Sequence, residues 1–478
     1  MKGISPNPYL PLYEYVPDGE PRIFEDRLYI YGSHDSSGGD WFCLEDYVVW
    51  SAPLDDLSDW RYEGVSYRKD QDPHNSDGKW ELFAPDVVQG PDKRYYLFYC
   101  IRKMLEFGVA VSDSPAGPFT FYGHVHYADS AVFREHMPYD PSVLVDDDGR
   151  IYLYYGYTSE AIAVKLGGSV SLGCMVLELE QDMLTVAKEP VVCLPRDINT
   201  AGTGFEGHGY YEAPSMRKIN GRYYLVYSSE VCHELCYAVS ERPTEGFVYG
   251  GVIVSNADIG LNGRKAPVCL PGNDHGGIVC VNGQYYIFYQ RHTQCTQFSR
   301  QGCAEPIPIL PDGSIPQVEV TSSGLTGGAL PAVGVWPAAY ACHLTYRDSM
   351  KMLAYREADP AVFPCIWEDI SEADESEREQ YIRNITDGTT IGFKYFKADH
   401  VRNIRLLMRG GGDGVFELRS DDPENGECLA AAKINGSKDC TDSWRAIAAP
   451  VSWDGVHALY LIYHGSGSVC LKEIEFET

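Results

Sequence analysis

Carboxylates and one histidine recur at equivalent places in five similar stretches of this sequence. Each precedes by about eleven residues a tyrosine in an aromatic run, and the five positions are Asp18, Asp86, Asp140, Glu212 and His275. Hydrolysis of a glycosidic bond needs two carboxyl groups, one to protonate the leaving oxygen and one to activate water or attack directly. A third carboxylate keeps the acid protonated, because it disfavours a second negative charge nearby. Asp18, Asp140 and Glu212 are the candidates for this chemistry.

The elements that must position these groups are five β-hairpins. The second strand of each hairpin contains one of the aligned tyrosines, which are Tyr29, Tyr96, Tyr152, Tyr224 and Tyr286. The hairpin in EAPSMRKINGRYYLVYS turns at Asn220-Gly221, a pair that accepts the positive φ of a tight turn. A β-rich unit that repeats every 55 to 75 residues or so predicts a five-bladed propeller over residues 1–320.

In a propeller the first strand of each blade lines the central channel, so equivalent positions should converge at one end of the axis. A single aspartate at such a place is more often a turn residue. An aligned set of ionisable groups favours a shared site instead, because clustered charges are costly unless they are paired, solvated or used.

Other polar or aromatic residues follow the blade strands in loops. We expect them to bind substrate, and they are His34, Asp35, Trp80 and Arg291. The same role is expected for Asp86 of the aligned set, at the start of the first strand of its blade.

A second pattern of alternating apolar and polar residues begins near residue 366. It predicts an antiparallel β-sandwich, jelly-roll-like, over residues 366–478. Between the two domains, the Gly/Ser/Pro-rich text from residue 321 predicts a linker over residues 321–365. The chain is therefore expected to be all-β.

Composition excludes several classes of partner. The net charge of −29 argues against nucleic acid and anionic membranes, both of which need basic patches. The N-terminal sequence contains no apolar run of signal-peptide type, and 15 cysteines without a regular framework are typical of reduced thiols. We therefore expect a cytoplasmic protein, and the sequence leaves its oligomeric state open.

Three segments resemble glycoside hydrolase family 43: PDGEPRIF, YDPSVLVDDDGRIYLYYG and YEAPSMRKINGRYYLVYS. That family comprises five-bladed propeller enzymes that act on arabinose- and xylose-containing glycans with inversion. The resemblance implies that Asp18 is the general base, that Asp140 tunes the pKa of the acid, and that Glu212 is the general acid. It also places His275 beside a channel water or a structural Ca²⁺, with no cofactor required.

Two glutamates compete for these roles. Glu206 lies close to Glu212, whose spacing to Asn220-Gly221 fits the family better, and Glu20 follows Asp18 in a Gly-Glu-Pro context that departs from the common Pro-Ser. This departure is typical of a divergent subgroup. The C-terminal domain resembles carbohydrate-binding modules of family 6 in IGFKYF and GVHALYLIYHGSGS, so it should either bind glycan or brace the propeller.

The expected function is an inverting, exo-acting glycoside hydrolase that releases terminal α-L-arabinofuranose from plant-type oligosaccharides. A β-xylosidase and a β-galactofuranosidase are alternatives on the same scaffold. A non-catalytic glycan-binding propeller is the alternative of another class, although retention of all three carboxylates argues against it.

Overall fold

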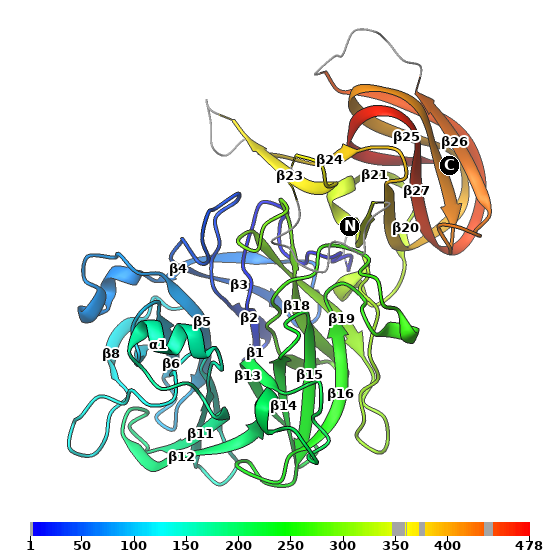
Figure 1. The fold of residues 1–478 in the computed structure, drawn as a ribbon. Coiled ribbons are helices and arrows are strands. Elements are labelled where there is room, and N and C mark those ends of the chain that lie inside the picture. Colours follow the sequence, from blue (N-terminus) through cyan, green and yellow to red (C-terminus); the bar gives the residue numbers. More distant parts are fainter. Residues whose placement is uncertain (1–2, 347–358, 360, 372–377, 435–442) are drawn as a thin grey trace.

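A computed structural model describes residues 3–346, 359, 361–371, 378–434 and 443–478. It contains five small sheets and one larger C-terminal sheet (Figure 1). Within the described residues, no helix has the length and apolar character that a membrane crossing requires.

The five small sheets are the blades of a propeller, and each is an antiparallel meander. Blades 1 and 2 consist of β1 (Glu20–Phe24), β2 (Arg27–Tyr31), β3 (Tyr47–Pro53), β4 (Arg61–Tyr67), β5 (Leu82–Gln89), β6 (Tyr95–Ile101), β7 (Phe107–Ser112) and β8 (Thr120–His124). Blades 3 and 4 consist of β9 (Ser142–Val145), β10 (Ile151–Tyr155), β11 (Gly173–Leu179), β12 (Val186–Pro195), β13 (Tyr210–Ile219), β14 (Arg222–Ser229), β15 (Glu234–Ser240) and β16 (Val248–Ser255). Blade 5 has three strands, β17 (Ile278–Val281), β18 (Gln284–His292) and β19 (Arg300–Ile307).

The five aligned tyrosines all lie on second strands and are buried, which confirms the repeat. The turn between β13 and β14 has positive φ at both Asn220 (51°) and Gly221 (80°), as its sequence predicts. One helix, α1 (Glu160–Leu166), is inserted between β10 and β11. Short 3-10 turns occupy η1 (Lys69–Gln71), η2 (Pro73–Asn75), η3 (Asp197–Asn199), η4 (Leu261–Gly263), η5 (Gly324–Thr326) and η6 (Ala338–Tyr340).

The N-terminal segment closes the ring along β19. The Tyr9 N–H donates to the Gly302 carbonyl (3.3 Å), and the Asn7 side-chain amide donates to the carbonyls of Ala304 and Thr321, both at 3.0 Å. The other four blades have four strands each. In blade 5 the N-terminal segment around Asn7 and Tyr9 lies along β19 at the outer side of the sheet, a pairing that local sequence patterns do not reveal.

The C-terminal sheet folds around its own hydrophobic core. Its strands are β20 (Leu330–Pro331), β21 (Gly334–Pro337), β22 (His343–Thr345), β23 (Cys365–Ile370), β24 (Arg378–Ile385), β25 (Thr390–Ser420), β26 (Cys428–Ile434) and β27 (Arg445–Glu477). β25 and β27 are long runs with register shifts, so that Leu406 pairs with both Ile447 and Ile474. This wrapping gives the sandwich expected from the sequence.

Within the predicted linker, residues 330–345 contribute three short strands to the C-terminal sheet, and residues 347–358 and 360 lie outside the described part of the chain. β20 and β22 pair with β25, and β21 pairs with β27. Its strands are only two to four residues long and contain Gly and Pro. Such short segments carry no alternating pattern, which is why the sequence suggested a linker.

The sandwich lies against the propeller near the N-terminus (Figure 1). Lys394 of β25 is buried at the contact, where its Nζ lies 3.3 Å from Asp258 and 2.8 Å from Glu319 of the propeller. The backbone N–H groups of Ser322 and Ser323 both donate to the Lys394 carbonyl. Charge pairing and backbone hydrogen bonds therefore join the two domains.

Candidate active site

A cavity of about 530 Å³ lies on the propeller axis. Its wall contains one residue from the inner edge of each blade, and these are Asp18, Ala84, Asp140, Glu212 and His275. The three carboxylates that the sequence brought forward as catalytic candidates are thus together in one cavity, with the histidine among them.

Blade 2 contributes Ala84 to this ring, where the sequence alignment had placed Asp86. In blades 1, 3 and 5, the cavity residue lies four positions before the strand partner of the aligned tyrosine. The partner of Tyr96 is Val88, which makes Ala84 the equivalent residue. Asp86 pairs with Phe98 inside β5, only two residues before Val88, so it does not take the place that Asp18, Asp140 and His275 have in their blades. The approximate spacing to Tyr96 did not reveal this difference of two residues.

Asp18 is held by groups from the last blade. Its Oδ1 accepts from Arg300 Nη1 at 2.9 Å, and its backbone N–H donates to Gln290 Oε1 at 2.7 Å. Asp35 binds the other edge of the same guanidinium, with Nε to Oδ2 at 2.8 Å and Nη2 to Oδ1 at 2.9 Å. Asp35 therefore lies behind the cavity and positions Arg300, although we expected it to bind substrate.

Asp140 and Glu212 lie on neighbouring blades. The Ala213 N–H, next to Glu212, donates to Asp140 Oδ2 at 3.2 Å. Asp18 and Asp140 each precede their strand by two residues and share a left-handed backbone, with φ of 56° and 52°. A non-glycine residue in this region costs free energy and persists where the surroundings enforce it, as they do at functional sites.

The surroundings shift the pKa values of the three carboxyl groups in different directions. Burial, followed by the charges of Asp140 and Asp18, raises the pKa of Glu212 well above its usual range. Burial also raises the pKa of Asp140 to about 6, although the charge of His275 opposes it. Burial would raise the pKa of Asp18 too, but the charges of Arg300 and His275 outweigh it and hold this pKa below its ordinary value. The surroundings thus favour the protonated form of Glu212 and the ionised form of Asp18.

Comparison with known proteins agrees with this arrangement. The family described as "Glycosyl hydrolases family 43" matches residues 16–315. The chain belongs to glycoside hydrolase family 43.

Two of the following relatives of this family 43 enzyme match both domains, and one matches part of the chain. A protein of Thermoclostridium stercorarium named "Xylosidase/arabinosidase" is 48% identical over 98% of this chain and 97% of its own length. The solved structure of a family 43 β-xylosidase/α-arabinofuranosidase from a compost metagenome, in complex with xylotriose, superposes with a TM-score of 0.52 at 26% identity, covering 66% of this chain and 97% of that one. A Bacillus subtilis arabinoxylan arabinofuranohydrolase, at 20% identity and a TM-score of 0.51, covers 100% of this chain and 98% of its own and shares the fold.

Below the carboxylates, the axis of the family 43 enzyme is filled by ion pairs. Arg217 Nη2 donates to Glu20 Oε2 at 2.6 Å, and Arg22 Nε donates to Asp86 Oδ1 at 2.9 Å. Glu20 therefore lies beneath the cavity and does not line it, so Asp18 is the better placed of the two candidate bases. Asp86 is fully buried in the same layer.

His275 lies between these two layers. Its Nδ1 is 4.0 Å from Asp18 Oδ1, and its Nε2 is 4.0 Å from Glu20 Oε1. Calcium prefers six to eight oxygen ligands, and both carboxylates here are already neutralised by arginines. The residues around His275 thus do not fit a directly bound calcium ion.

Two further residues that we expected to bind substrate lie outside the cavity lining. His34 Nε2 is 2.9 Å from Glu14 Oε1, and its Nδ1 is 2.9 Å from the Asp46 carbonyl. Trp80 packs behind the wall, with Lys103 Nζ 3.7 Å from the centre of its ring. Neither side chain lines the cavity.

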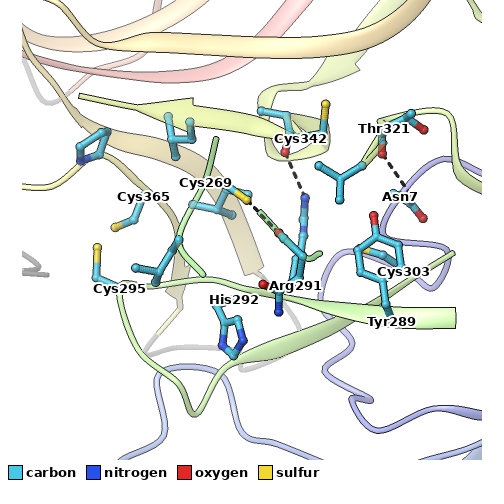
Figure 2. A pocket seen from close by; sticks show the side chains of 17 residues that line it. Asn7, Cys269, Tyr289, Arg291, His292, Cys295, Cys303, Thr321, Cys342 and Cys365 are labelled. Atoms are coloured by element: carbon cyan, nitrogen blue, oxygen red, sulfur yellow. Dashed lines mark hydrogen bonds between the residues drawn. The ribbon is translucent and has the colours of Figure 1, made fainter. Parts of the chain in front are cut away.

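Arg291 faces the C-terminal domain. Its Nη1 donates to the Ala339 carbonyl at 2.8 Å. Figure 2 shows it in a separate small pocket with His292, Cys295 and Cys365. Successive strand residues point to opposite faces, and the sequence alone did not show which face of β18 meets the cavity.

Glu206, the competing acid, lies on an exposed loop. Its carboxylate accepts from the Gly202 N–H, and it is not part of the cavity wall. The position of Glu212 in the wall favours it as the acid.

The sequence did not single out several residues of the wall. Arg300 is the main one, since it pairs with Asp18 across 282 residues of chain. Aromatic side chains make up much of the rest, and they are Trp41, Phe42, Phe83, Tyr139, Tyr157 and Tyr211. A high aromatic content was visible in the sequence, but strand propensity explains most of it equally well.

Proposed function

We propose that this enzyme is an exo-acting, inverting glycosidase that releases terminal α-L-arabinofuranose from plant-type oligosaccharides. The observation that carries the proposal is one cavity lined by both Asp18 and Glu212, in which the surroundings lower the pKa of Asp18 and raise that of Glu212. A non-catalytic glycan-binding propeller would have no need for carboxyl groups held in opposite states.

In the proposed reaction Asp18 takes a proton from a water molecule, which attacks the anomeric carbon. Glu212 gives its proton to the leaving oxygen on the other face of the sugar, so the configuration inverts. Asp140 keeps Glu212 protonated through its negative charge. Arg300 keeps Asp18 ionised and fixes its direction. No step requires a cofactor.

The shape of the site supports exo action. The carboxylates lie on the axis, where the layer of Glu20, Arg22, Asp86 and Arg217 closes the channel beneath them. A pocket closed at one end accommodates the terminal sugar of a chain.

Release of terminal β-D-xylose is the second candidate, because the relative with 48% identity over 98% of this chain is named for both sugars. Release of β-D-galactofuranose is the third, since an Aspergillus niger relative, 25% identical over 68% of this chain, is named "Beta-D-galactofuranosidase xynD".

The test is a panel of 4-nitrophenyl glycosides of these three sugars, followed by proton NMR of the first-formed sugar. We expect arabinofuranoside to be cleaved fastest and the released sugar to have the inverted configuration. A retained configuration would contradict the mechanism, since it requires a covalent intermediate and carboxyl groups only about 5 Å apart.

We also propose a cytoplasmic location, with imported oligosaccharides as substrates. The cysteines within the described residues are free thiols, as is usual in a reducing compartment. For the C-terminal sandwich, the buried contacts of Lys394 support the bracing role.

A further inference from the structure

Cationic side chains gather at the open end of the cavity. Arg102 and Lys103 follow directly after β6, and Lys165 lies on α1, the helix inserted in blade 3. All three line the cavity, and both lysines are exposed. The mouth is thus built from two different blades that both present positive charge.

Two tryptophans contact Arg102 and Lys103. The Arg102 guanidinium lies 4.0 Å from the centre of the Trp41 ring, and Lys103 Nζ lies 3.7 Å from that of Trp80. Lys79 Nζ approaches the same Trp80 ring at 4.8 Å. Cation–π contacts of this kind orient a charge without neutralising it.

The positive charge at the mouth is largely uncompensated. Arg102 Nη1 is 3.1 Å from Glu81 Oε2, but no ion pair is found within the described part of the chain for Lys103, Lys165 or Lys79. The charges of Arg102, Lys165 and Lys79 add to desolvation in lowering the pKa of Lys103, as expected where cations are close together. This local excess of positive charge at the mouth contrasts with the net charge of −29 of the whole chain.

We propose that the cavity takes a substrate that carries an anionic group on its leaving-group side, either the carboxylate of a uronic acid or a phosphate ester. This inference rests on the proposed glycosidase function. The sugar to be released lies at the buried carboxylates, so the remainder of the substrate extends to the mouth, past Lys103 and Lys165. Fixed cations at that place attract an anion over several ångströms and bind it by charge-assisted hydrogen bonds.

The cations at the mouth act on the substrate rather than on the catalytic acid. The charges that shift Glu212 are those of Asp140, Asp18 and Arg300, and the lysines are not among them. Their effect should therefore appear as selectivity between charged and neutral leaving groups.

The experiment compares kcat/KM for three oligosaccharides with the same terminal pentose. One is neutral, one carries glucuronic acid on the penultimate sugar, and one carries a phosphate ester there. We expect kcat/KM for an anionic substrate to exceed that for the neutral one by about tenfold at low ionic strength, and the ratio to fall as salt is added. Whichever anion is preferred identifies the source of the charge.

The variant Lys103→Gln with Lys165→Gln should reduce this ratio about tenfold. A matched control, Lys397→Gln with Lys433→Gln, makes the same change of charge on exposed residues of the sandwich and should keep the ratio. The inference would be wrong, and the glycosidase function unaffected, if kcat/KM were equal for charged and neutral substrates. The same holds if the ratio of the two changed neither with salt nor with the lysine substitutions. If none of the pentosides were hydrolysed, the proposed function itself would fail.

Discussion

Arg300 Nη1 donates to Asp18 Oδ1 at 2.9 Å, and both side chains are almost fully buried. The pair joins the start of blade 1 to the third strand of blade 5, and Asp35 fixes the guanidinium from behind. The proposed base thus owes its ionised state to a residue from the far end of the propeller.

The first prediction concerns this pair. Replacing Arg300 by Met removes the charge that holds the pKa of Asp18 down, so this pKa should rise. Because the base must be ionised to act, the acidic limb of the kcat/KM profile should move to higher pH. The profile is measured on a nitrophenyl glycoside, with circular dichroism to verify folding. An acidic limb that stays in place in a folded variant would show that Arg300 does not set this pKa.

A second prediction concerns Asp140. In Asp140→Asn, Glu212 loses a neighbouring negative charge and its pKa falls. The alkaline limb of the profile should then move to lower pH, and the rate at neutral pH should drop. Asp86→Asn serves as a comparison, because Asp86 is a buried aspartate outside the cavity lining. A similar shift of the alkaline limb in both variants would contradict a specific role for Asp140.

The third prediction distinguishes the two candidate acids. Glu212→Gln should lower kcat about 10²- to 10⁴-fold on oligosaccharides, whose leaving group needs a proton. The loss should be smaller on aryl glycosides, because a phenolate leaves unaided. Glu206→Gln, which changes an exposed residue by the same atoms, should leave both rates near those of the parent. The opposite pattern in the two variants would transfer the acid role to Glu206.

A fourth prediction concerns the joint between the domains. Lys394→Met removes the cation between Asp258 and Glu319 and leaves the fully buried Asp258 without its counter-charge. The loss of one partner from a buried pair costs about 3–5 kcal/mol, so the melting temperature should fall by several degrees. Lys397→Met alters an exposed lysine nearby on the same strand and is the control. Equal melting temperatures for the two variants would mean that the pair does not brace the domains.

Much of this fold could be predicted from the sequence, because the signals that define it are local and repeated. Aromatic runs with Asn-Gly or Asp-Gly turns identify the hairpins, and Tyr152 and Tyr224 fix their register from the sequence alone. The same repetition brought Asp18, Asp140 and Glu212 to the cavity, since one position in each repeat faces the axis.

The remaining features of the fold and of the site could not be predicted, because they depend on contacts between residues that are far apart in sequence. The strand pairing of β5 with β6 places Ala84, and not Asp86, four residues before the partner of Tyr96, so Ala84 is the residue of blade 2 that meets the cavity. The role of Arg300 depends on its ion pairs with Asp18 and Asp35, which lie more than 260 residues away in sequence, so no local pattern around Arg300 predicts it. The short strands of residues 330–345 pair with strands that follow much later, so their own composition suggested a linker.

The hydrogen bonds of Asn7 and Tyr9 along β19 have a consequence for how the protein is made. During synthesis Asn7 and Tyr9 find their partners only after about 300 more residues have been added, at about 5–20 residues per second. Until then the blades form an open arc, with an unpaired strand edge at its end. Deletion of the segment around Asn7 and Tyr9, or a bulky domain fused next to it, would therefore slow or prevent closure of the propeller ring and cause aggregation during synthesis.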